Sequence, residues 1–456
     1  MIYVCILKIK NDMTDFLNIL GFEPNEEQKQ ALTQIEDFIS SDADVFILKG
    51  SAGTGKTSVI KAITNKLTKE NINFYLNAPT GRASAIIGEK TGQKSRTVHS
   101  RIYTPQKTED GFVIKLIRKI NTEEAFSVYL VDESSMINST LVHDNTFLVS
   151  KPLLADFIDF VKQGNKKNKI IFIGDRFQLP PVYENFSSAL SSDYLSKYFN
   201  LKCTSFELSK VMRQEEGSNI LDIAVLIKNF IKQGYTNMNV PVRKEQYSTH
   251  AMKRYMSFFD SDKTDKTIAI CSTNRDVDYW NNWVRRELGI ASAYISEGDF
   301  IINQTTWINK SGNWVQKGEF GKIILISTEF ETFADLTFTD AIIEFQTFSD
   351  TKKQVKAKIL LNSLNTNHGI LDEEREKKLY ADVMKYNAKF RQSKDIADDK
   401  FLGAMRLKHG YAVTCHKAQG GEWDNVLIHP WKMGNNLQWA YTAVTRARKN
   451  VFSYVA

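Results

Sequence analysis

The sequence has 456 residues, of which 42% are hydrophobic and 25% are charged. A chain of this length exceeds the size at which one hydrophobic core stops growing, so we expect two to four domains. The composition excludes global disorder, and no apolar stretch reaches the about 18 to 20 residues that span a bilayer. The formal charge of +7 permits a polyanionic partner but is equally compatible with ordinary solubility.

The N-terminal residues and the cysteines indicate a cytoplasmic protein. The first ten residues are apolar but include Lys8 and Lys10 and lack a small-residue cleavage site, so we expect neither a signal peptide nor an anchor. They predict an edge strand, or an upstream extension that makes Met13 the start in place of Met1. The four cysteines have no metal-binding spacing, which excludes a recognisable zinc site or disulfide framework.

Residues 45 to 67 predict a buried strand, a glycine-rich turn and a helix. The turn fits the phosphate-binding pattern GxxxxGK[ST] in the strand-to-helix context that the pattern requires. Its glycines let backbone N–H groups surround phosphate oxygens, Lys56 adds a full charge, and Thr57 is a Mg²⁺ ligand. The residues expected to contact the nucleotide are Gly50, Ser51, Ala52, Gly53, Thr54, Gly55, Lys56 and Thr57. The sequence therefore predicts a nucleoside triphosphate site, although kinases, switches, transporters and motors share this loop.

Two further predicted strands end in polar residues. The first ends in Asp132 and Glu133, and the second is followed by Gln178. Because the carboxyl ends of parallel strands face one crevice, these side chains can meet the phosphates. We expect Asp132 to hold Mg²⁺, Glu133 to orient or deprotonate the attacking water, and Gln178 to bond the terminal phosphate or the water.

Several segments outside these strands carry their own signals. Asp110 and Gly111 form a two-residue hairpin signal between segments of mixed polarity. Residues 296 to 365 alternate short apolar runs with turn residues, which predicts a small antiparallel β-barrel. The charged residues 372 to 403 predict helices in a solvated arm.

The C-terminal residues predict a strand, a polar glycine-rich turn, a second strand, a helix over 437 to 448 and a last strand. The turn is dense in side chains that can contact phosphate or sugar. Arg446 lies near the end of the helix, and Arg213 is a second candidate cation. A guanidinium is always charged and forks onto phosphate, so either arginine can stabilise the charge of a phosphoryl-transfer transition state.

An ordered set of motifs carries a resemblance to a known family. In chain order the motifs are GSAGTGKT, APTGRA, TVHS, DESSM, GDRFQLPPV, MRQ, TCHKAQGGEWD and YTAVTRAR. The set resembles the superfamily 1 DNA helicases and, within them, the RecD-like branch that includes the Dda-like helicases. The Pif helicases are close relatives. The resemblance runs from about residue 24 to residue 456.

The resemblance implies an α/β fold with two RecA-like P-loop NTPase cores. A β-hairpin is inserted in the first core, and a small β-barrel with a helical arm is inserted in the second. The implied boundaries are 1–98 and 122–205 for the first core, 99–121 for the hairpin, 206–295 and 405–456 for the second core, and 296–404 for the barrel and arm.

The resemblance also assigns roles at the nucleotide. Gln28 is similar to the glutamine that reads the adenine edge, and Glu422 to a residue near the ribose. Arg213 and Arg446 are similar to the two arginines that the second core offers to a nucleotide held by the first. Met212 stands where relatives often place an aromatic residue beside the adenine.

A sequence-independent grip on single-stranded DNA is a further implication of the resemblance. The residues implied in it are Pro79, Thr80, Gly81, Arg82, Thr97, His99, Thr414, His416 and Lys417. In relatives the inserted hairpin is a pin that keeps parted strands apart, and Phe112 and Tyr103 are the candidates for its tip.

We therefore expect an ATP- and Mg²⁺-dependent DNA helicase of replication, repair or recombination that moves on single-stranded DNA and separates duplexes. Its direction, 5′ to 3′, comes from the resemblance alone. The expected partners are single-stranded and forked DNA together with replication or repair proteins. We expect a monomer in the cytoplasm that does not bind a membrane.

Alternatives remain open at this point. An RNA-tracking motor of superfamily 1 or a Pif-like helicase fits the same motifs, since nothing in them reads the 2′-OH. A P-loop switch or kinase explains Lys56 and Asp132 but not the motifs of the second half. A non-enzymatic nucleic-acid binder gives no use for Glu133.

Overall fold

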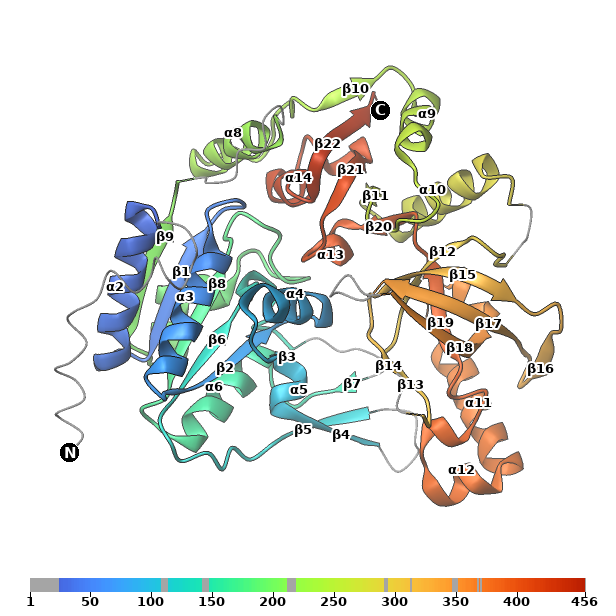
Figure 1. The fold of residues 1–456 in the computed structure, drawn as a ribbon, viewed down its shortest axis with the longest axis horizontal. Coiled ribbons are helices and arrows are strands. Elements are labelled where there is room, and N and C mark those ends of the chain that lie inside the picture. The colour runs from blue at the N-terminus through green and yellow to red at the C-terminus, as the bar shows by residue number, and fades with distance from the viewer. Residues whose placement is uncertain are drawn as a thin grey trace. The chain divides into compact units, whose positions relative to one another are not determined.

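The computed structural model describes residues 24–107, 114–141, 147–210, 219–290, 294–311, 314–346, 352–366, 369 and 371–455. The chain forms two compact units, and their elements are labelled in Figure 1. The first unit comprises Met1–Gln106 with Lys115–Gly217, and the second comprises Lys107–Ile114 with Ser218–Ala456. None of the helices within the described ranges has the length and apolar character that a bilayer crossing requires.

A six-stranded parallel sheet forms the centre of the first unit, in the order β3-β2-β6-β8-β1-β9 (Figure 1). Its strands are β1 (Val45–Gly50), β2 (Asn73–Ala78), β3 (Ser95–Thr97), β6 (Ser127–Val131), β8 (Lys169–Gly174) and β9 (Cys203–Leu208). The helices of this unit are α2 (Glu26–Ser40), α3 (Lys56–Lys69), α4 (Gly81–Thr91), α5 (Val98–Ile102), α6 (Leu153–Gly164) and α7 (Ser192–Phe199). Parallel strands need crossover connections, and these helices provide them.

Both faces of this sheet are buried, and the central strand β1 shows how. Phe46 and Leu48 pack in one apolar cluster with residues of α2 and α3. Val45 and Ile47 point the other way, because successive side chains of a strand alternate, and pack in a second cluster with residues of α5 and α6. A strand buried on both faces is continuously apolar, as the sequence is here. The predicted α/β fold with a parallel sheet is confirmed.

The strands of this sheet end at one level. Lys49, next to the end of β1, pairs with Gly174 at the end of β8. Val131, the last residue of β6, pairs with Asn77 of β2 on one side and with Phe172 of β8 on the other. The segments that follow β1, β2, β6 and β8 therefore leave the sheet along a common edge.

A small three-stranded sheet lies where the sequence predicts the hairpin. Its strands are β4 (Tyr103–Lys107), β5 (Ile114–Arg118) and β7 (Phe147–Leu148), in the order β4-β5-β7. The predicted turn at Asp110 and Gly111, and Phe112, lie outside the described residues. Tyr103 is not available as a tip residue, because its ring is buried in the core and its hydroxyl donates to Asp156 Oδ2 at 2.7 Å. The expectation for Tyr103 is therefore wrong.

The second unit contains a five-stranded parallel sheet in the order β10-β22-β21-β11-β20 (Figure 1). Its strands are β10 (Arg243–Glu245), β11 (Thr267–Cys271), β20 (Ala412–Thr414), β21 (Trp423–Ile428) and β22 (Ala447–Tyr454). Its helices are α8 (Ile220–Lys232), α9 (Ser248–Phe258), α10 (Asn274–Glu287), α13 (Cys415–Ala418) and α14 (Leu437–Val444).

Helix α14 ends earlier than the sequence predicts. The expected helix ran to residue 448, whereas Ala447 already belongs to β22. The sheet captures these residues, because the Trp423 N–H donates to the Arg446 carbonyl at 2.9 Å and Trp423 pairs with Ala447. Sheet pairing thus overrides the helical periodicity of the sequence.

Between α10 and β20 of this sheet, the chain forms a closed ring of strands. The ring runs β12-β15-β17-β18-β19 and returns to β12, and its neighbours are antiparallel except β18 and β19. Its strands are β12 (Phe300–Asn303), β15 (Phe320–Ile326), β17 (Leu336–Gln346), β18 (Lys352–Leu360) and β19 (Met405–His409). Shorter strands outside the ring are β13 (Trp307–Ile308), β14 (Trp314–Val315) and β16 (Glu331–Phe333).

The helical arm lies between the two parallel strands of the ring and is the crossover that such strands require. It contains α11 (Glu373–Tyr386) and α12 (Ala388–Ser393). Leu379, Val383 and Phe390 of the arm are fully buried in a cluster with Phe338 and Leu360 of the ring. The arm is therefore helical as predicted, but one of its faces packs on the ring and is not solvated.

A buried carboxylate joins the ring to the second parallel sheet. Asp299, at the start of β12, is 0% exposed. Its oxygens accept hydrogen bonds from Arg285 Nε at 2.9 Å and Nη2 at 3.0 Å, and Arg285 belongs to α10. The Tyr411 hydroxyl donates to Asp299 at 3.0 Å, and the Ser296 N–H at 2.8 Å. These hydrogen bonds stabilise the buried carboxylate, and the bonds from Arg285 of α10 connect the start of β12 to the helices of the second parallel sheet.

We expect Asp299→Ala to lower the free energy of unfolding by about 3 to 5 kcal/mol, because it leaves the Arg285 charge buried without its partner. Chemical denaturation followed by circular dichroism measures this loss. The matched control is Asp262→Ala, which removes an exposed partner of Lys322 and should change stability little. Equal stability of the two variants would contradict this role of Asp299.

Candidate nucleotide and nucleic-acid site

The common strand-end edge of the first unit gathers the predicted nucleotide residues. The loop from Gly50 to Gly55 follows β1, Asp132 and Glu133 follow β6, and Gln178 comes four residues after β8. These strands are neighbours, in the order β6-β8-β1. The structure therefore brings together residues that lie more than a hundred positions apart in the chain.

The loop after β1 is shaped for an anion. Gly53 and Gly55 have left-handed φ angles of 77° and 84°, which side chains rarely adopt. The Thr54 hydroxyl closes the turn by donating to the Ser51 carbonyl at 2.8 Å. Lys56 opens α3 and donates from Nζ to the carbonyls of Gly50 at 2.8 Å and Ser51 at 3.1 Å. A helix N-terminus and a lysine thus meet at this loop, as phosphate binding requires.

Gln28 lies directly against this loop. A Cβ atom on Gly55 would stand only 2.2 Å from Gln28 Nε2, so any larger residue there would displace the end of the Gln28 side chain. The amide of Gln28 is oriented by a capping box at the start of α2, in which Gln28 Oε1 accepts from the Asn25 N–H at 3.0 Å. The side chain is 2% exposed, and its Nε2 faces the loop. This position fits the predicted contact with a nucleobase.

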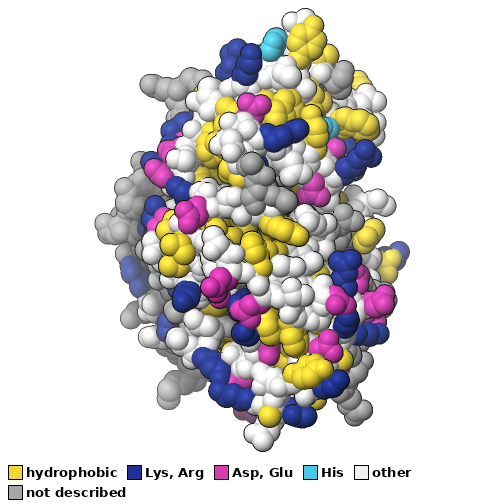
Figure 2. All heavy atoms as spheres, turned by 90° about the vertical axis from the view of Figure 1, so that its right-hand side faces the viewer, with side chains coloured by type: hydrophobic (Ala, Val, Ile, Leu, Met, Phe, Trp, Pro, Cys, Tyr) yellow, Lys and Arg dark blue, Asp and Glu magenta, His cyan; other side chains and the backbone are white. Residues whose placement is uncertain are grey.

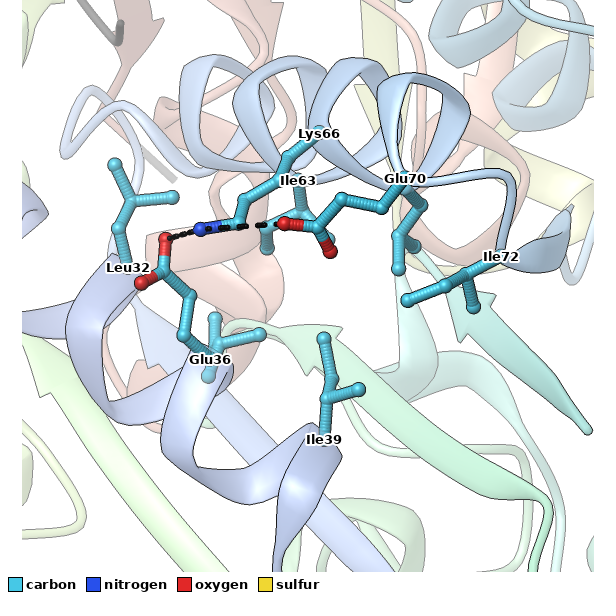
Figure 3. A pocket seen from close by; sticks show the side chains of 9 residues that line it. Leu32, Glu36, Ile39, Ile63, Lys66, Glu70 and Ile72 are labelled. Atoms are coloured by element: carbon cyan, nitrogen blue, oxygen red, sulfur yellow. Dashed lines mark ion pairs between the residues drawn. The ribbon is translucent and has the colours of Figure 1, made fainter. Parts of the chain in front are cut away.

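The packing of α2 on α3 holds Gln28 in this place. Figure 3 shows an apolar pocket between the two helices, with Leu32, Ile39 and Ile63 among its lining side chains. Lys66 lies beside it and pairs with Glu36 at 2.6 Å (Figure 3). The pocket measures about 30 Å³, room for a single water-sized guest, so it is a packing feature and not a nucleotide site.

Glu133 and Gln178 each present a buried acceptor with no hydrogen-bond partner among the described residues, Glu133 Oε2 and Gln178 Oε1. Glu133 also holds a left-handed backbone with φ 50°, a strain that is found at functional sites. Buried acceptors are costly when they are unsatisfied. Two such acceptors at the ends of neighbouring strands suit a water molecule, which has two hydrogens to donate.

Asp132 lies in an environment that favours added positive charge. Burial, and then the neighbouring Glu133 carboxylate, raise the pKa of Asp132 to about 7, and the Lys56 charge acts against this rise. The Asp132 carboxylate and the Thr57 hydroxyl are the hard oxygen donors that Mg²⁺ prefers. Within the described ranges no group of three or more His, Cys, Asp or Glu side chains forms a cation site.

Two residues at this edge were not predicted from the sequence. Glu27, next to Gln28, accepts from the N–H groups of Ser209 and Lys210 at 2.8 Å each, and so holds the two residues that follow β9. Asp175 is fully buried and accepts from the N–H groups of Phe177 and Gln178, which shapes the turn carrying Gln178. Each has one sequence signal: Glu27 is adjacent to Gln28, and Asp175 directly follows the end of β8.

The predicted strand-contacting turns of the first unit are helix starts. Thr80 caps α4 by accepting from the Ala83 N–H at 3.2 Å, and Thr97 caps α5 by accepting from the Ser100 N–H at 3.1 Å. Pro79, Gly81 and Arg82 surround the first cap, and His99 is exposed one residue into α5. Both turns follow strands of the same sheet, β2 and β3, beyond β6.

The predicted residues of the second unit gather around α13. Thr414 precedes this helical turn, and His416 and Lys417 lie on it. Lys417 Nζ donates to Gln304 Oε1 at 2.9 Å, a contact that no sequence pattern indicated. Desolvation, and then the Lys432 charge, lower the pKa of His416. Glu422 is partly buried just before β21.

Arg446 is 5% exposed and is held by three hydrogen bonds. Nε donates to the Thr442 carbonyl at 3.1 Å, Nη1 to the Gly421 carbonyl at 3.2 Å, and Nη2 to Thr445 Oγ1 at 3.2 Å. The guanidinium thereby connects the end of α14 to the segment before β21. Arg213 and Met212 lie outside the described residues.

Comparison with known families identifies two domains. The family described as AAA domain matches residues 23–229, which contain the phosphate loop, Asp132, Glu133 and Gln178. The family described as UvrD-like helicase C-terminal domain matches residues 409–453, which contain α13 and Arg446.

Individual proteins agree with these matches. The ATP-dependent RecD2 DNA helicase of Deinococcus radiodurans is 25% identical over 94% of this chain and 48% of its own length. The ATP-dependent DNA helicase dda of Enterobacteria phage T4 is 26% identical over 61% of this chain and 59% of its own length. The chain thus spans about half the length of these curated relatives.

The fold has a counterpart among solved structures. The crystal structure of Pif1 helicase from Candida albicans superimposes with a TM-score of 0.52 at 16% identity, covering 95% of each chain. The sequence matches confirm the resemblance that the motifs indicated, to the superfamily 1 helicases of the RecD and Dda type, and the fold is similar to that of Pif1 helicase.

Proposed function

We propose that the protein is an ATP-dependent DNA helicase that translocates on single-stranded DNA and separates duplex strands. One observation carries the proposal: the buried acceptors of Glu133 and Gln178, without partners among the described residues, stand at the same sheet edge as the Lys56 loop. A loop that only connected a strand to a helix would have no use for these two acceptors. The resemblance to RecD-like helicases supplies the direction, 5′ to 3′.

In this proposal the loop that follows β1 binds the phosphates of ATP. Lys56 exchanges the carbonyls of Gly50 and Ser51 for phosphate oxygens, and the N–H groups of the loop from Gly50 to Thr57 surround them. Gln28 contacts the adenine, and Glu422 lies near the ribose. Thr57 and Asp132 hold Mg²⁺, which neutralises phosphate charge when it is bound.

Glu133 and Gln178 act on the attacking water. Glu133 Oε2 accepts one hydrogen of the water and Gln178 Oε1 the other, which fixes the oxygen for attack on the terminal phosphate. The strained backbone of Glu133 supports a positioning role, because such strain persists only where the surrounding structure imposes it.

Arg446 and Arg213 are proposed to supply the cations that stabilise the transition state, as the resemblance implies. Because Arg446 is bonded through its guanidinium to the Gly421 and Thr442 carbonyls, any phosphate contact must compete with these bonds or share its donors. Hydrolysis then changes which unit holds the DNA more firmly, and alternating grip produces stepping.

The DNA strand is proposed to run over the two helix starts of the first unit and α13 of the second. Pro79, Thr80, Gly81, Arg82, Thr97 and His99 contact it from the first unit, and Thr414, His416 and Lys417 from the second. Such contacts to sugar and phosphate are independent of sequence, which suits a protein that moves along any strand.

The inserted elements keep their predicted roles as proposals. The segment between β4 and β5 is proposed to be the pin that separates strands. The ring β12-β15-β17-β18-β19 with its arm is proposed to be the inserted barrel of the second core, and its pairing supports this. The ring takes in β19 (Met405–His409), which begins beyond the predicted boundary at 404.

We expect Lys56→Ala to lower the rate of ATP hydrolysis by about 100-fold or more, because it removes a charge that stabilises the transition state. Binding of single-stranded DNA should persist, since the substitution removes only a phosphate contact of the nucleotide. A phosphate-release assay and an anisotropy titration measure the two effects. Lys69→Ala, at the exposed far end of α3, is the control. Hydrolysis by Lys56→Ala at the wild-type rate would refute the site.

Gly55→Ala tests the contact between the loop and Gln28. The new Cβ would displace Gln28 Nε2, so we expect binding of an ATP analogue to weaken by about tenfold or more. Gly92→Ala is the matched control, because Gly92 has a similar left-handed φ of 69° but open space around its Cβ position. Both variants carry about the same backbone strain of 1 to 2 kcal/mol. An equal, small effect of both on calorimetric affinity would exclude a role for the Gln28 contact.

A comparison of polynucleotides tests the proposed function itself. We expect the ATPase rate of the wild-type protein to rise sharply with single-stranded DNA and much less with RNA of the same length. Equal stimulation by both would favour an RNA-tracking motor of superfamily 1. A rate that is indifferent to either polymer would favour the P-loop switch or kinase and would overturn the helicase proposal.

A further inference from the structure

Two consecutive buried amides stand at the end of β12 in the second unit. Asn303 is 0% exposed and Gln304 is 3% exposed. A buried polar side chain is costly unless it is hydrogen-bonded, so its partners show what it holds in place. Here Asn303 bonds to the turn that carries Lys317, and Gln304 bonds directly to Lys417.

Asn303 fixes the turn that carries Lys317. Its Nδ2 donates to the carbonyls of Thr305 at 2.5 Å, Val315 at 3.3 Å and Gln316 at 3.0 Å. The backbone adds a bond from the Gly318 N–H to the Asn303 carbonyl at 2.8 Å. Gly318 has a left-handed φ of 90°, which lets the chain turn directly after Lys317. The exposed Lys317 therefore projects from an anchored turn.

Gln304 fixes Lys417. Its Oε1 accepts from Lys417 Nζ at 2.9 Å, and its Nε2 donates to the Ile302 carbonyl at 3.1 Å. The stem of Gln304 packs so closely against Gly369 that a Cβ atom on that residue would lie 2.3 Å from Gln304 Cγ. The lysine of α13 is thus tied to the ring by a bond that spans 113 residues of sequence.

The two lysines act on each other electrostatically. Burial, and then the Lys317 and Lys408 charges, lower the pKa of Lys417 to about 8. Lys408 is compensated by Asp278 at 2.9 Å, and Asp278 also faces Lys417. Neither Lys317 nor Lys417 forms an ion pair within the part of the chain that the structure describes. The Lys317 charge therefore makes the Lys417 charge less favourable, and a phosphate bound by both lysines would offset this cost.

This pair differs from the ordinary surface of the protein. On the face shown in Figure 2, Lys and Arg side chains are interspersed with Asp and Glu. Pairs such as Lys358 with Glu331 at 2.6 Å, on the strands of the ring, are typical of such a surface. The positive charge thus does not form one broad patch on that face, and two lysines without an ion-pair partner among the described residues are the more specific signal.

We propose that Lys317 and Lys417 together bind the phosphate backbone of a single nucleic-acid strand, and that Gln304 is the positioning residue that holds Lys417 for this contact. The inference rests on the proposed function, in which α13 contacts the strand. It adds the ring as a second source of phosphate contacts beside the parallel sheet. Lysine binds phosphate as a point charge, so the contact is independent of base sequence.

The salt dependence of binding tests the two lysines. Fluorescence anisotropy with labelled oligo(dT), without nucleotide, gives log K against log salt concentration for the wild type, Lys317→Ala and Lys417→Ala. Loss of one phosphate contact should reduce the slope by about 0.7 and weaken binding by about fivefold at 0.1 M salt. The control is Lys253→Ala, an exposed lysine of α9, which should keep the wild-type slope.

A double-mutant cycle tests the positioning role of Gln304. Gln304→Met keeps the size of the side chain but removes the oxygen that accepts from Lys417. It should weaken binding in the wild-type background and have no further effect when combined with Lys417→Ala. Equal weakening in both backgrounds would assign Gln304 a purely structural role and overturn this part of the proposal.

The outcomes separate this inference from the proposed function. If wild-type protein does not bind oligo(dT), the proposed function fails and the inference fails with it. If wild-type protein binds and its ATPase is stimulated, while Lys317→Ala keeps the wild-type slope, only the inference is overturned. A reduced slope for both lysine variants together with a non-additive cycle supports it.

Discussion

The candidate nucleotide site depends on one constraint, which is that all strands of the first sheet run in the same direction. Strands that are parallel end on the same edge, and their register aligns Lys49 with Gly174 and Val131 with Phe172. The phosphate loop, the acidic pair and the glutamine therefore follow neighbouring strands at one edge of the sheet. If one strand were reversed, the residues that follow it would lie at the opposite edge of the sheet. A strand of about five residues is roughly 15 Å long, so they would be about that far from the other site residues.

The same constraint explains how much could be predicted from the sequence. The loop with Lys56, the pair Asp132 and Glu133, and the segment with Gln178 each follow an apolar strand, and strand direction determines the rest. The parallel α/β sheets and the helicase resemblance are accordingly confirmed. Tyr103 was misjudged, because its tyrosine ring fits a wedge tip and a core equally well in sequence, and only its contact with Asp156 decides.

Contacts between distant segments were beyond the reach of sequence patterns. Glu27 accepts a hydrogen bond from Ser209, 182 positions away, and Gln304 accepts one from Lys417, 113 positions away. The end of α14 depends likewise on pairing with β21, which periodicity within 437 to 448 does not reveal. Such hydrogen bonds form only when distant elements pack together in the fold. A short stretch of sequence around one residue does not indicate which distant residue it will contact.

The way the ring closes has a consequence for assembly. Each of β12, β15, β17, β18 and β19 has a strand on both sides, but the ladder between β18 and β19 is short. All of β18 pairs with β17, whereas only its last two residues, Ile359 and Leu360, pair with β19. No described strand pairs with residues 352–358 on the side opposite β17, so this is the stretch of the ring along which an extended peptide from another chain can join by β-augmentation.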